Sequence, residues 1–160
     1  MIKTVVWIVI ILAALITALG FAAGRKSAGM PAPTSKDALL PPCPDTPNCV
    51  STEMPTSHAS YIAPIAIAKA DVSSNGEKHL LDTAQAKIES LGGRVTSITN
   101  NTINAEFKSR LFRFVDDVLV QVDEKENVYR IRSSSRVGHS DLGVNRKRVE
   151  AIRQLIDRSN

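Results

Sequence analysis

A stretch of 21 residues without a charged side chain, residues 4–24, constrains this chain more than any other feature. Valine, isoleucine, leucine and alanine dominate it. As a helix it would be about 30 Å long, the thickness of the hydrocarbon core of a bilayer. A secretory signal peptide has a shorter apolar region of about 7–15 residues, and no clean small-residue cleavage site follows this one. We therefore expect a retained membrane helix through residues 4–24, with a cleaved signal peptide as the alternative.

The remainder of the chain has room for one domain rather than two. We expect residues 1–26 to form the membrane anchor or signal segment. Residues 27–42 are rich in proline, alanine and serine, which indicates an extended linker, and residues 43–160 are expected to form one α+β domain. Basic residues flank the apolar stretch on both sides, Lys3 on one and Arg25 and Lys26 on the other, so charge bias predicts no orientation.

The formal net charge of +4 is concentrated locally. Residues 130–160 carry eight basic and three acidic side chains, whereas residues 27–129 carry nine basic and 13 acidic ones. A local excess of this kind indicates a local anion site or an internal salt-bridge system. Residues 130–160, which carry this excess of basic side chains, contain no aromatic residue, so the pattern does not predict nucleic-acid binding.

Two cysteines, Cys43 and Cys49, enclose five residues that include Pro44 and Pro47. The prolines disfavour a helix and favour turns that bring the two sulfurs together. We expect a structural disulfide, which needs an oxidising compartment and therefore favours the periplasm. A redox-active pair is the alternative, although such pairs usually have two intervening residues. Two sulfurs supply only half of a zinc site, so we predict no metal.

Hydrophobic periodicity predicts the helices. Ser74 and Glu77 match a capping box, apolar residues then recur at helical spacing, and Gly92 and Gly93 end the run. A second helix is expected over residues 142–156, capped by Ser140 or Asp141.

Alternating apolar and polar residues predict strands at residues 94–99, 102–108, 114–123 and 128–134, with residues 61–67 added at an edge. The expected fold is α+β: an antiparallel meander of about four to five strands, with two helices packed on one face, preceded by one N-terminal transmembrane helix.

Two segments resemble one known family. Residues 43–51 read Cys-Pro-Asp-Thr-Pro-Asn-Cys-Val-Ser, and a longer motif covers residues 114–118 and 132–150. Together they resemble the domain of unknown function 1499 (DUF1499) over about residues 40–157. Members are typically small, often membrane-anchored or exported bacterial proteins, and the resemblance implies a fold but no activity. This chain departs from the family pattern at Leu119, where an acidic residue is common, and at His139, where an aromatic one is common.

The register of the last hairpin brings the charged residues of this motif together. A turn near residues 125 and 126 puts Asp117 opposite Ser134 and Leu119 opposite Arg132. Arginine suits bidentate recognition of carboxylate or phosphate, and serine hydroxyls and a helix N-terminus also donate hydrogen bonds to anions. The predicted anion-binding site consists of Arg132, Ser133, Ser135, Arg136, Asn145, Arg146 and Arg148.

The same residues also suit a structural network in which Asp116 and Asp117 hold the arginines and no ligand binds. Catalysis would need one of these aspartates as a base, or His139 beside Ser140, but neighbours in sequence do not point at one another, so no catalytic residue is predicted. A third alternative places the basic last helix against anionic headgroups.

The predicted function is that of a binding or interaction module for a small anionic ligand or an envelope protein, without a cofactor. It would sit on the periplasmic side of a bacterial inner membrane, on a single-pass anchor. A hydrolase acting on a cell-envelope component is the alternative.

Overall fold

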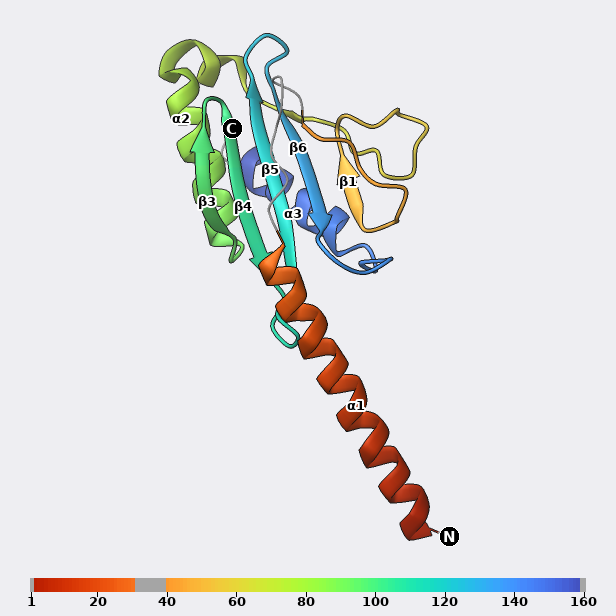
Figure 1. Ribbon diagram of the computed structural model, residues 1–160. Coiled ribbons are helices and arrows are strands. Elements are labelled where there is room, and N and C mark those ends of the chain that lie inside the picture. Colours follow the sequence, from red (N-terminus) through yellow and green to blue (C-terminus); the bar gives the residue numbers. More distant parts are fainter. Residues whose placement is uncertain (1, 31–39, 159–160) are drawn as a thin grey trace.

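The computed structural model describes residues 2–30 and 40–158, apart from the side chains of residues 69–75. Within that part of the chain, six strands form one antiparallel sheet, two helices cover one face of it, and a third helix projects from the domain (Figure 1). In chain order the elements are α1 (Ile2–Gly29), β1 (Cys49–Ser51), β2 (Ile65–Ala66), α2 (Lys69–Ser90), β3 (Arg94–Thr99), β4 (Thr102–Lys108), β5 (Val115–Asp123), β6 (Val128–Ser135) and α3 (Val144–Asp157).

The hydrophobic core lies between the sheet and helices α2 and α3. Alternate residues of β4 and β5 point into it, as the sequence pattern predicts, since successive side chains of a strand point to opposite faces. The core is largely aliphatic, and Tyr129 donates its hydroxyl to the carbonyl oxygen of Leu80 in α2 at 3.0 Å. The predicted α+β fold is confirmed.

The central meander runs β3-β4-β5-β6, and the predicted register is confirmed: Asp117 pairs with Ser134 and Leu119 with Arg132. Beyond the meander, β1 and β2 both pair with β6 along its other edge. Strand β1 begins at Cys49 itself and is absent from the prediction. The predicted edge strand at residues 61–67 is reduced to the two residues of β2.

Helix α2 ends as predicted but begins earlier. The amide of Gly93 donates to the carbonyl of Ile88 at 3.0 Å and Gly92 has φ 85°, which is the glycine-terminated end that the sequence indicates. At the other end, helical residues precede Gly76, whose φ of 69° interrupts the helix. The predicted capping box begins at Ser74, whose side chain lies outside the described residues.

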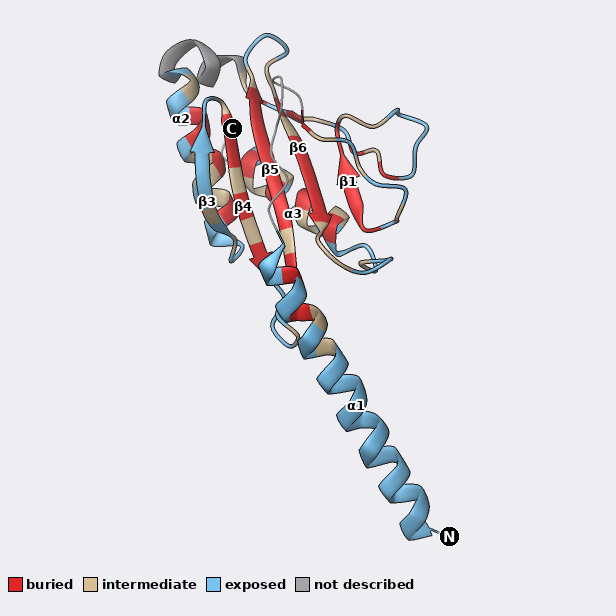
Figure 2. Ribbon diagram, viewed as in Figure 1, coloured by how far each residue is buried: buried red, intermediate tan, exposed pale blue. Residues whose placement is uncertain are grey.

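Helix α1 continues through Gly29, three residues past the predicted boundary at residue 26, because its last turns pack on the sheet. Most of the helix is exposed, while Gly24 and Ser27 are buried (Figure 2). The Ser27 hydroxyl accepts from the amide of Val115 at 2.9 Å and donates to its carbonyl at 3.2 Å. The end of α1 is therefore part of the domain rather than of a linker. Residues 31–39 of the predicted linker lie outside the described residues.

Candidate functional site

The two segments that resemble DUF1499 meet in space. Cys43 and Cys49 form a disulfide, and Asn48 lies within the loop that it closes. The Asn48 side chain donates to the carbonyl of Gly138 at 2.7 Å, and its own carbonyl accepts from the side-chain amide of Asn145 at 2.9 Å. The disulfide loop thus holds the segment between β6 and α3, residues 136–143, which we call the Arg136 loop. Nothing in the sequence pattern marks Asn48 for this role.

One charged network lies on the helix side of the sheet. Arg148 of α3 pairs with Asp116 of β5 at 2.7 Å and lies 4.6 Å from the centre of the Phe107 ring. It also donates to Ser133 at 3.0 Å and to the side-chain carbonyl of Asn145 at 2.6 Å. Asn145 is fully buried, so the network fastens α3 to the sheet.

A second network lies on the opposite face. Arg136 donates two hydrogen bonds of 2.8 and 2.7 Å to the carboxylate of Asp117 and pairs with Glu106 of β4 at 2.7 Å. A further contact of 3.4 Å reaches the carbonyl of Ser27 at the end of α1. The side chains of Arg136 and Asp117 are only 5% and 3% exposed, so this pair is closed to solvent.

Burial and pairing act in opposite directions on these groups. Burial raises the pKa of Asp117, and its hydrogen bonds from Arg136 oppose that rise without cancelling it. For Glu106, loss of hydration also acts to raise the pKa, but Arg136 and Arg94 outweigh it and hold the pKa below its ordinary value. The hydrogen bonds from Asp117 and Glu106 in turn raise the pKa of Arg136. The guanidinium is therefore charged and neutralised within the fold.

Arg132 differs from the other two arginines. It is 6% exposed and forms no salt bridge with a carboxylate of the described residues. One nitrogen donates to Ser134 at 2.6 Å and another lies 3.5 Å from the carbonyl of Pro42, while Nε has no partner in the part of the chain that the structure describes. Loss of hydration lowers the pKa of Arg132, an effect that nearby Asp117 opposes.

The structure does not bring all seven predicted anion-binding residues to one place. Ser133, Ser135, Asn145 and Arg148 share the helix-side network, in which Ser135 accepts from Asn145 at 3.1 Å. Arg132 and Arg136 lie on the other face, and Arg146 donates to the carbonyls of Ala59 and Tyr61. Asp116 and Asp117 each pair with an arginine, one on each face. The alternation of a strand, which separates neighbouring residues onto two faces, divides the motif.

A groove of about 330 Å³ opens beside the Arg136 loop. It lies between the end of α1 at Ala23, the β4–β5 connection at Phe114, and the start of α3 at Val144. The ionisable groups that line it are carboxylates, Asp116 and Asp141, and none of the predicted anion-binding arginines lines it. The groove therefore suits an apolar ligand better than an anionic one.

Ser140 and Asp141, which follow His139, serve the entry to α3. Asp141 accepts the amides of Gly143 and Asn145 at 2.9 and 2.7 Å, and Ser140 accepts the amide of Leu142 at 3.3 Å. The predicted cap at Ser140 or Asp141 is wrong, because Gly143 is the N-cap residue. Asp141 nevertheless accepts the amide of Asn145 in the first turn of the helix. Among the described residues, no three of His, Cys, Asp and Glu are grouped to hold a metal ion.

These features define a small α+β domain, stiffened by a disulfide and by two charged networks, on a helix long and apolar enough to cross a membrane. The family model described as "Protein of unknown function (DUF1499)" matches residues 39–156. The chain belongs to this family. No curated protein and no solved structure matches it.

Proposed function

We propose that this protein is a single-pass, membrane-anchored interaction module on the oxidising, periplasmic side of a bacterial inner membrane. It would bind an apolar segment of a partner protein in the groove beside the Arg136 loop. The observation that carries the proposal is the lining of that groove, which combines apolar side chains with two carboxylates and lies where α1 leaves the domain.

The packing of α1 supports a retained anchor over a cleaved signal peptide. Cleavage after residue 26 would remove Gly24, which lies so close to Phe112 that an added Cβ would collide with the Phe112 carbonyl. It would also free Ser27, whose hydroxyl bonds to both backbone groups of Val115. The mass of the protein purified from membranes distinguishes the intact chain from a cleaved one.

The charge balance favours a partner protein over a small anion at the groove. Asp116 is already paired with Arg148, and Asp141 accepts two backbone amides. An anion placed there would face two carboxylates without an unpaired cation. The groove presents Val137, Phe114 and Val144 instead, and apolar burial is the main source of affinity in such a site.

Photo-crosslinking in native membranes tests this proposal. A benzophenone amino acid at Val144 should form one discrete protein adduct, and the same group at exposed Glu124 should not. Glu124 follows β5 at the end away from α1, about 30 Å along the strand. The substitution Val137→Asp should remove the Val144 adduct without lowering the melting temperature by more than a few degrees. Equal adducts at both positions, or none at Val144, would contradict the proposal.

Arg132 supports a second candidate, a small anionic ligand on the other face of the sheet. Its buried Nε has no partner among the described residues, and a buried guanidinium that forms no salt bridge with them is costly. Phosphate or a carboxylate compound at 100 times its Kd should add about 2.7 kcal/mol to the free energy of unfolding. The shift should be absent in Arg132→Met, and a panel that shifts neither protein would remove this candidate. The hydrolase alternative stays a prediction.

A further inference from the structure

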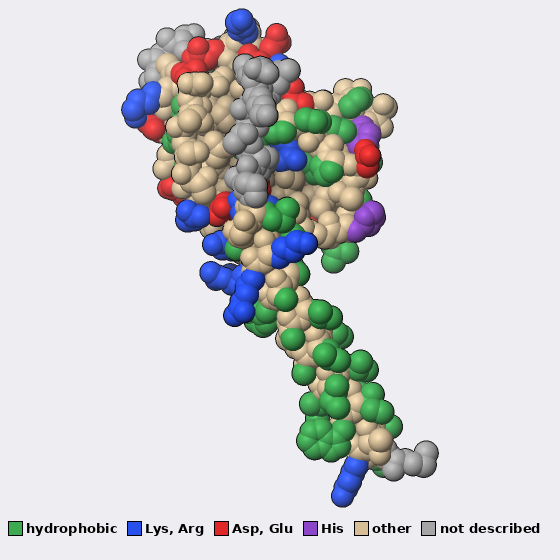
Figure 3. Space-filling model, viewed as in Figure 1, with side chains coloured by type: hydrophobic (Ala, Val, Ile, Leu, Met, Phe, Trp, Pro, Cys, Tyr) green, Lys and Arg blue, Asp and Glu red, His purple; other side chains and the backbone are tan. Residues whose placement is uncertain are grey.

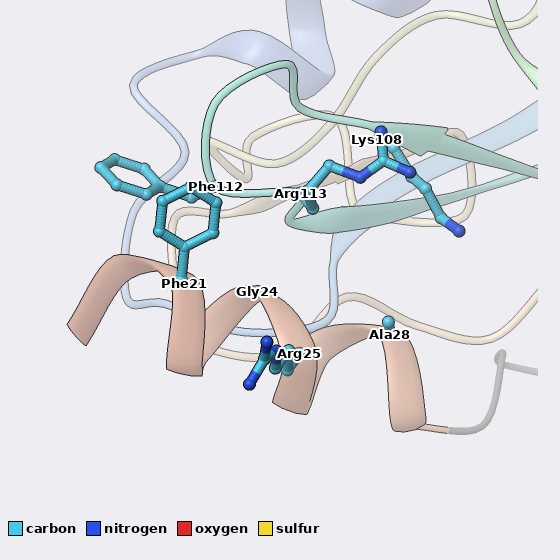
Figure 4. Close-up of a pocket in the computed structure, with 7 residues that line it drawn as sticks. All are labelled: Phe21, Gly24, Arg25, Ala28, Lys108, Phe112 and Arg113. Carbon is cyan, nitrogen blue, oxygen red and sulfur yellow. The ribbon is translucent and has the colours of Figure 1, made fainter. Parts of the chain in front are cut away.

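The connection between β4 and β5, residues 109–114, packs against the end of the apolar helix. The rings of Phe112 and Phe21 meet edge to face, with centroids 5.8 Å apart. Gly20 and Gly24 of α1 leave the space that this connection occupies, because an added Cβ at either would collide with Phe112. Figure 4 shows Phe21 and Phe112 side by side at the junction. These contacts therefore fix the position of the connection along the axis of α1.

The β4–β5 connection contacts α1 at the end of the membrane-spanning stretch. Gly24 is the last uncharged residue of a segment long enough to cross a bilayer, and Arg25 follows it. The Phe112 contact at Gly20 and Gly24 thus lies in the outermost turn of the apolar helix. Leu111, at the tip of the connection, is 61% exposed. A membrane-spanning α1 would bring this tip to the boundary between acyl chains and headgroups.

Basic side chains surround the same contact. A pocket of about 260 Å³ is lined by Arg25 of α1 and by Lys108 and Arg113 of the β4–β5 region, together with Phe21 and Phe112. Figure 3 shows basic side chains gathered where the helix joins the domain, and Figure 4 shows that Arg25 comes from α1 and that Lys108 and Arg113 come from the β4–β5 region. We call Arg25, Lys108 and Arg113 the basic collar.

The basic collar is not neutralised within the part of the chain that the structure describes. None of its three residues forms a salt bridge there, and the pocket lining contains no carboxylate. Lys26 and Arg110, which are exposed in the same two segments, add to the positive charge. Unpaired cations next to exposed apolar side chains match the structure of an anionic phospholipid, which has a phosphate headgroup above acyl chains.

We propose that the basic collar binds the phosphate of an anionic membrane phospholipid, with an acyl chain lying along Phe21 and Phe112. The lipid would hold the domain in a fixed orientation on the membrane surface. The site differs from the groove beside the Arg136 loop, since the two pockets have no lining residue in common. The proposal does rest on α1 being retained as the membrane helix.

Native mass spectrometry of the full-length protein in detergent, titrated with phosphatidylglycerol or phosphatidylcholine, tests the proposal. Wild-type protein should retain phosphatidylglycerol in preference to phosphatidylcholine. The variant Lys108→Gln/Arg113→Gln should bind phosphatidylglycerol about 30-fold more weakly, the loss expected for two basic residues at an anionic surface. The control Lys125→Gln/Lys147→Gln removes the same charge from exposed positions outside the collar and should bind like wild type.

Three results would overturn the proposal: equal retention of both lipids by wild type, equal loss in the control variant, or equal binding of soluble glycerol phosphate. The last result would mean that the ligand is a free organophosphate. The same spectra report the mass of the chain, so a missing α1 is recognised separately from a failed lipid site. A binding failure in an intact chain would leave the groove proposal unaffected.

Discussion

Two arginines of the family motif and two of the basic collar are alike in chemistry and opposite in environment. Arg136 and Arg148 are largely buried and each pairs with aspartate, whereas Arg25 and Arg113 are exposed and form no salt bridge with the described residues. A cation neutralised inside a fold stabilises it and offers little to a ligand. A cation left unpaired in an exposed pocket costs little stability and remains available. Arg136 and Arg148 therefore belong to the scaffold, and the cations of the basic collar are better candidates than these two arginines for binding an anionic ligand.

The largest effect that would test this contrast is the loss of Arg136. Arg136→Met leaves Asp117 buried without its partner, and breaking a buried pair in this way costs about 3–5 kcal/mol. The matched change Arg113→Met removes an exposed, unpaired guanidinium and should alter stability by less than about 0.5 kcal/mol. Denaturant unfolding of the full-length protein in detergent measures both. Similar losses of unfolding free energy in the two variants would mean that the environments of Arg136 and Arg113 do not differ as described.

The next largest effect is expected at Asn145, which links α3, the disulfide loop and Arg148. Asn145→Ala removes two accepted and two donated hydrogen bonds at a fully buried position, which should cost about 2–3 kcal/mol. Gln154→Ala, on an exposed position of the same helix, is the control and should be near neutral. Circular dichroism during thermal unfolding compares them. A near-neutral Asn145→Ala would show that the network is dispensable for α3.

Opening the disulfide should have a somewhat smaller effect. The Cys43–Cys49 bridge closes a loop of about seven residues, for which chain entropy predicts a loss of about 2 kcal/mol. Because Asn48 in that loop bonds to Gly138, amide exchange in the Arg136 loop should also accelerate on reduction. Reductant should have no effect on Cys43→Ser/Cys49→Ser. Unchanged exchange after reduction would mean that the bridge does not hold the Arg136 loop.

Much of the fold could be predicted because its cues are local. The alternation in β4 and the turn near residues 125 and 126 fix the faces and register of the meander, and both predictions are confirmed. The sequence also predicts that the apolar segment of α1 is long enough to cross a membrane. Strand β1 could not be predicted, because its three residues, Cys49–Ser51, are too few to carry a periodic pattern and pair only with the distant β6.

The candidate site was harder to predict than the fold. The sequence places both Asp116 and Asp117 near Arg132 and Arg136, whereas in the structure Asp116 pairs with Arg148 on one face of the sheet and Asp117 with Arg136 on the other. The roles of Ser27 and Asn48 depend on contacts across about 90 residues, which no local pattern reports. The basic collar was not predicted from the sequence for the same reason. Arg25 and Arg113 are far apart in sequence and line one pocket only because Phe112 packs against α1.

The smallest effect is a pH dependence, which further separates the paired arginines from the collar. The pKa of Glu106 is lowered in the fold by Arg136 and Arg94, despite burial. A lowered folded-state pKa stabilises the protein above the unfolded value of about 4.3, and the benefit is lost as pH falls through the folded value. The raised pKa of Asp117 acts in the opposite direction, since its protonated form is favoured by folding.

Glu106→Gln should therefore lose less stability than wild type as the pH falls from about 5 to 3, because the group that gains the proton is gone. Glu124→Gln, in the exposed β5–β6 turn, should follow the wild-type slope. Removing collar charge with Lys108→Gln/Arg113→Gln should also leave the slope unchanged, because no carboxylate of the described residues pairs with either cation. Denaturant unfolding at several pH values measures these slopes. A collar variant with the slope of Glu106→Gln would mean that an acidic group does neutralise the collar, and the contrast between the two sets of arginines would fail.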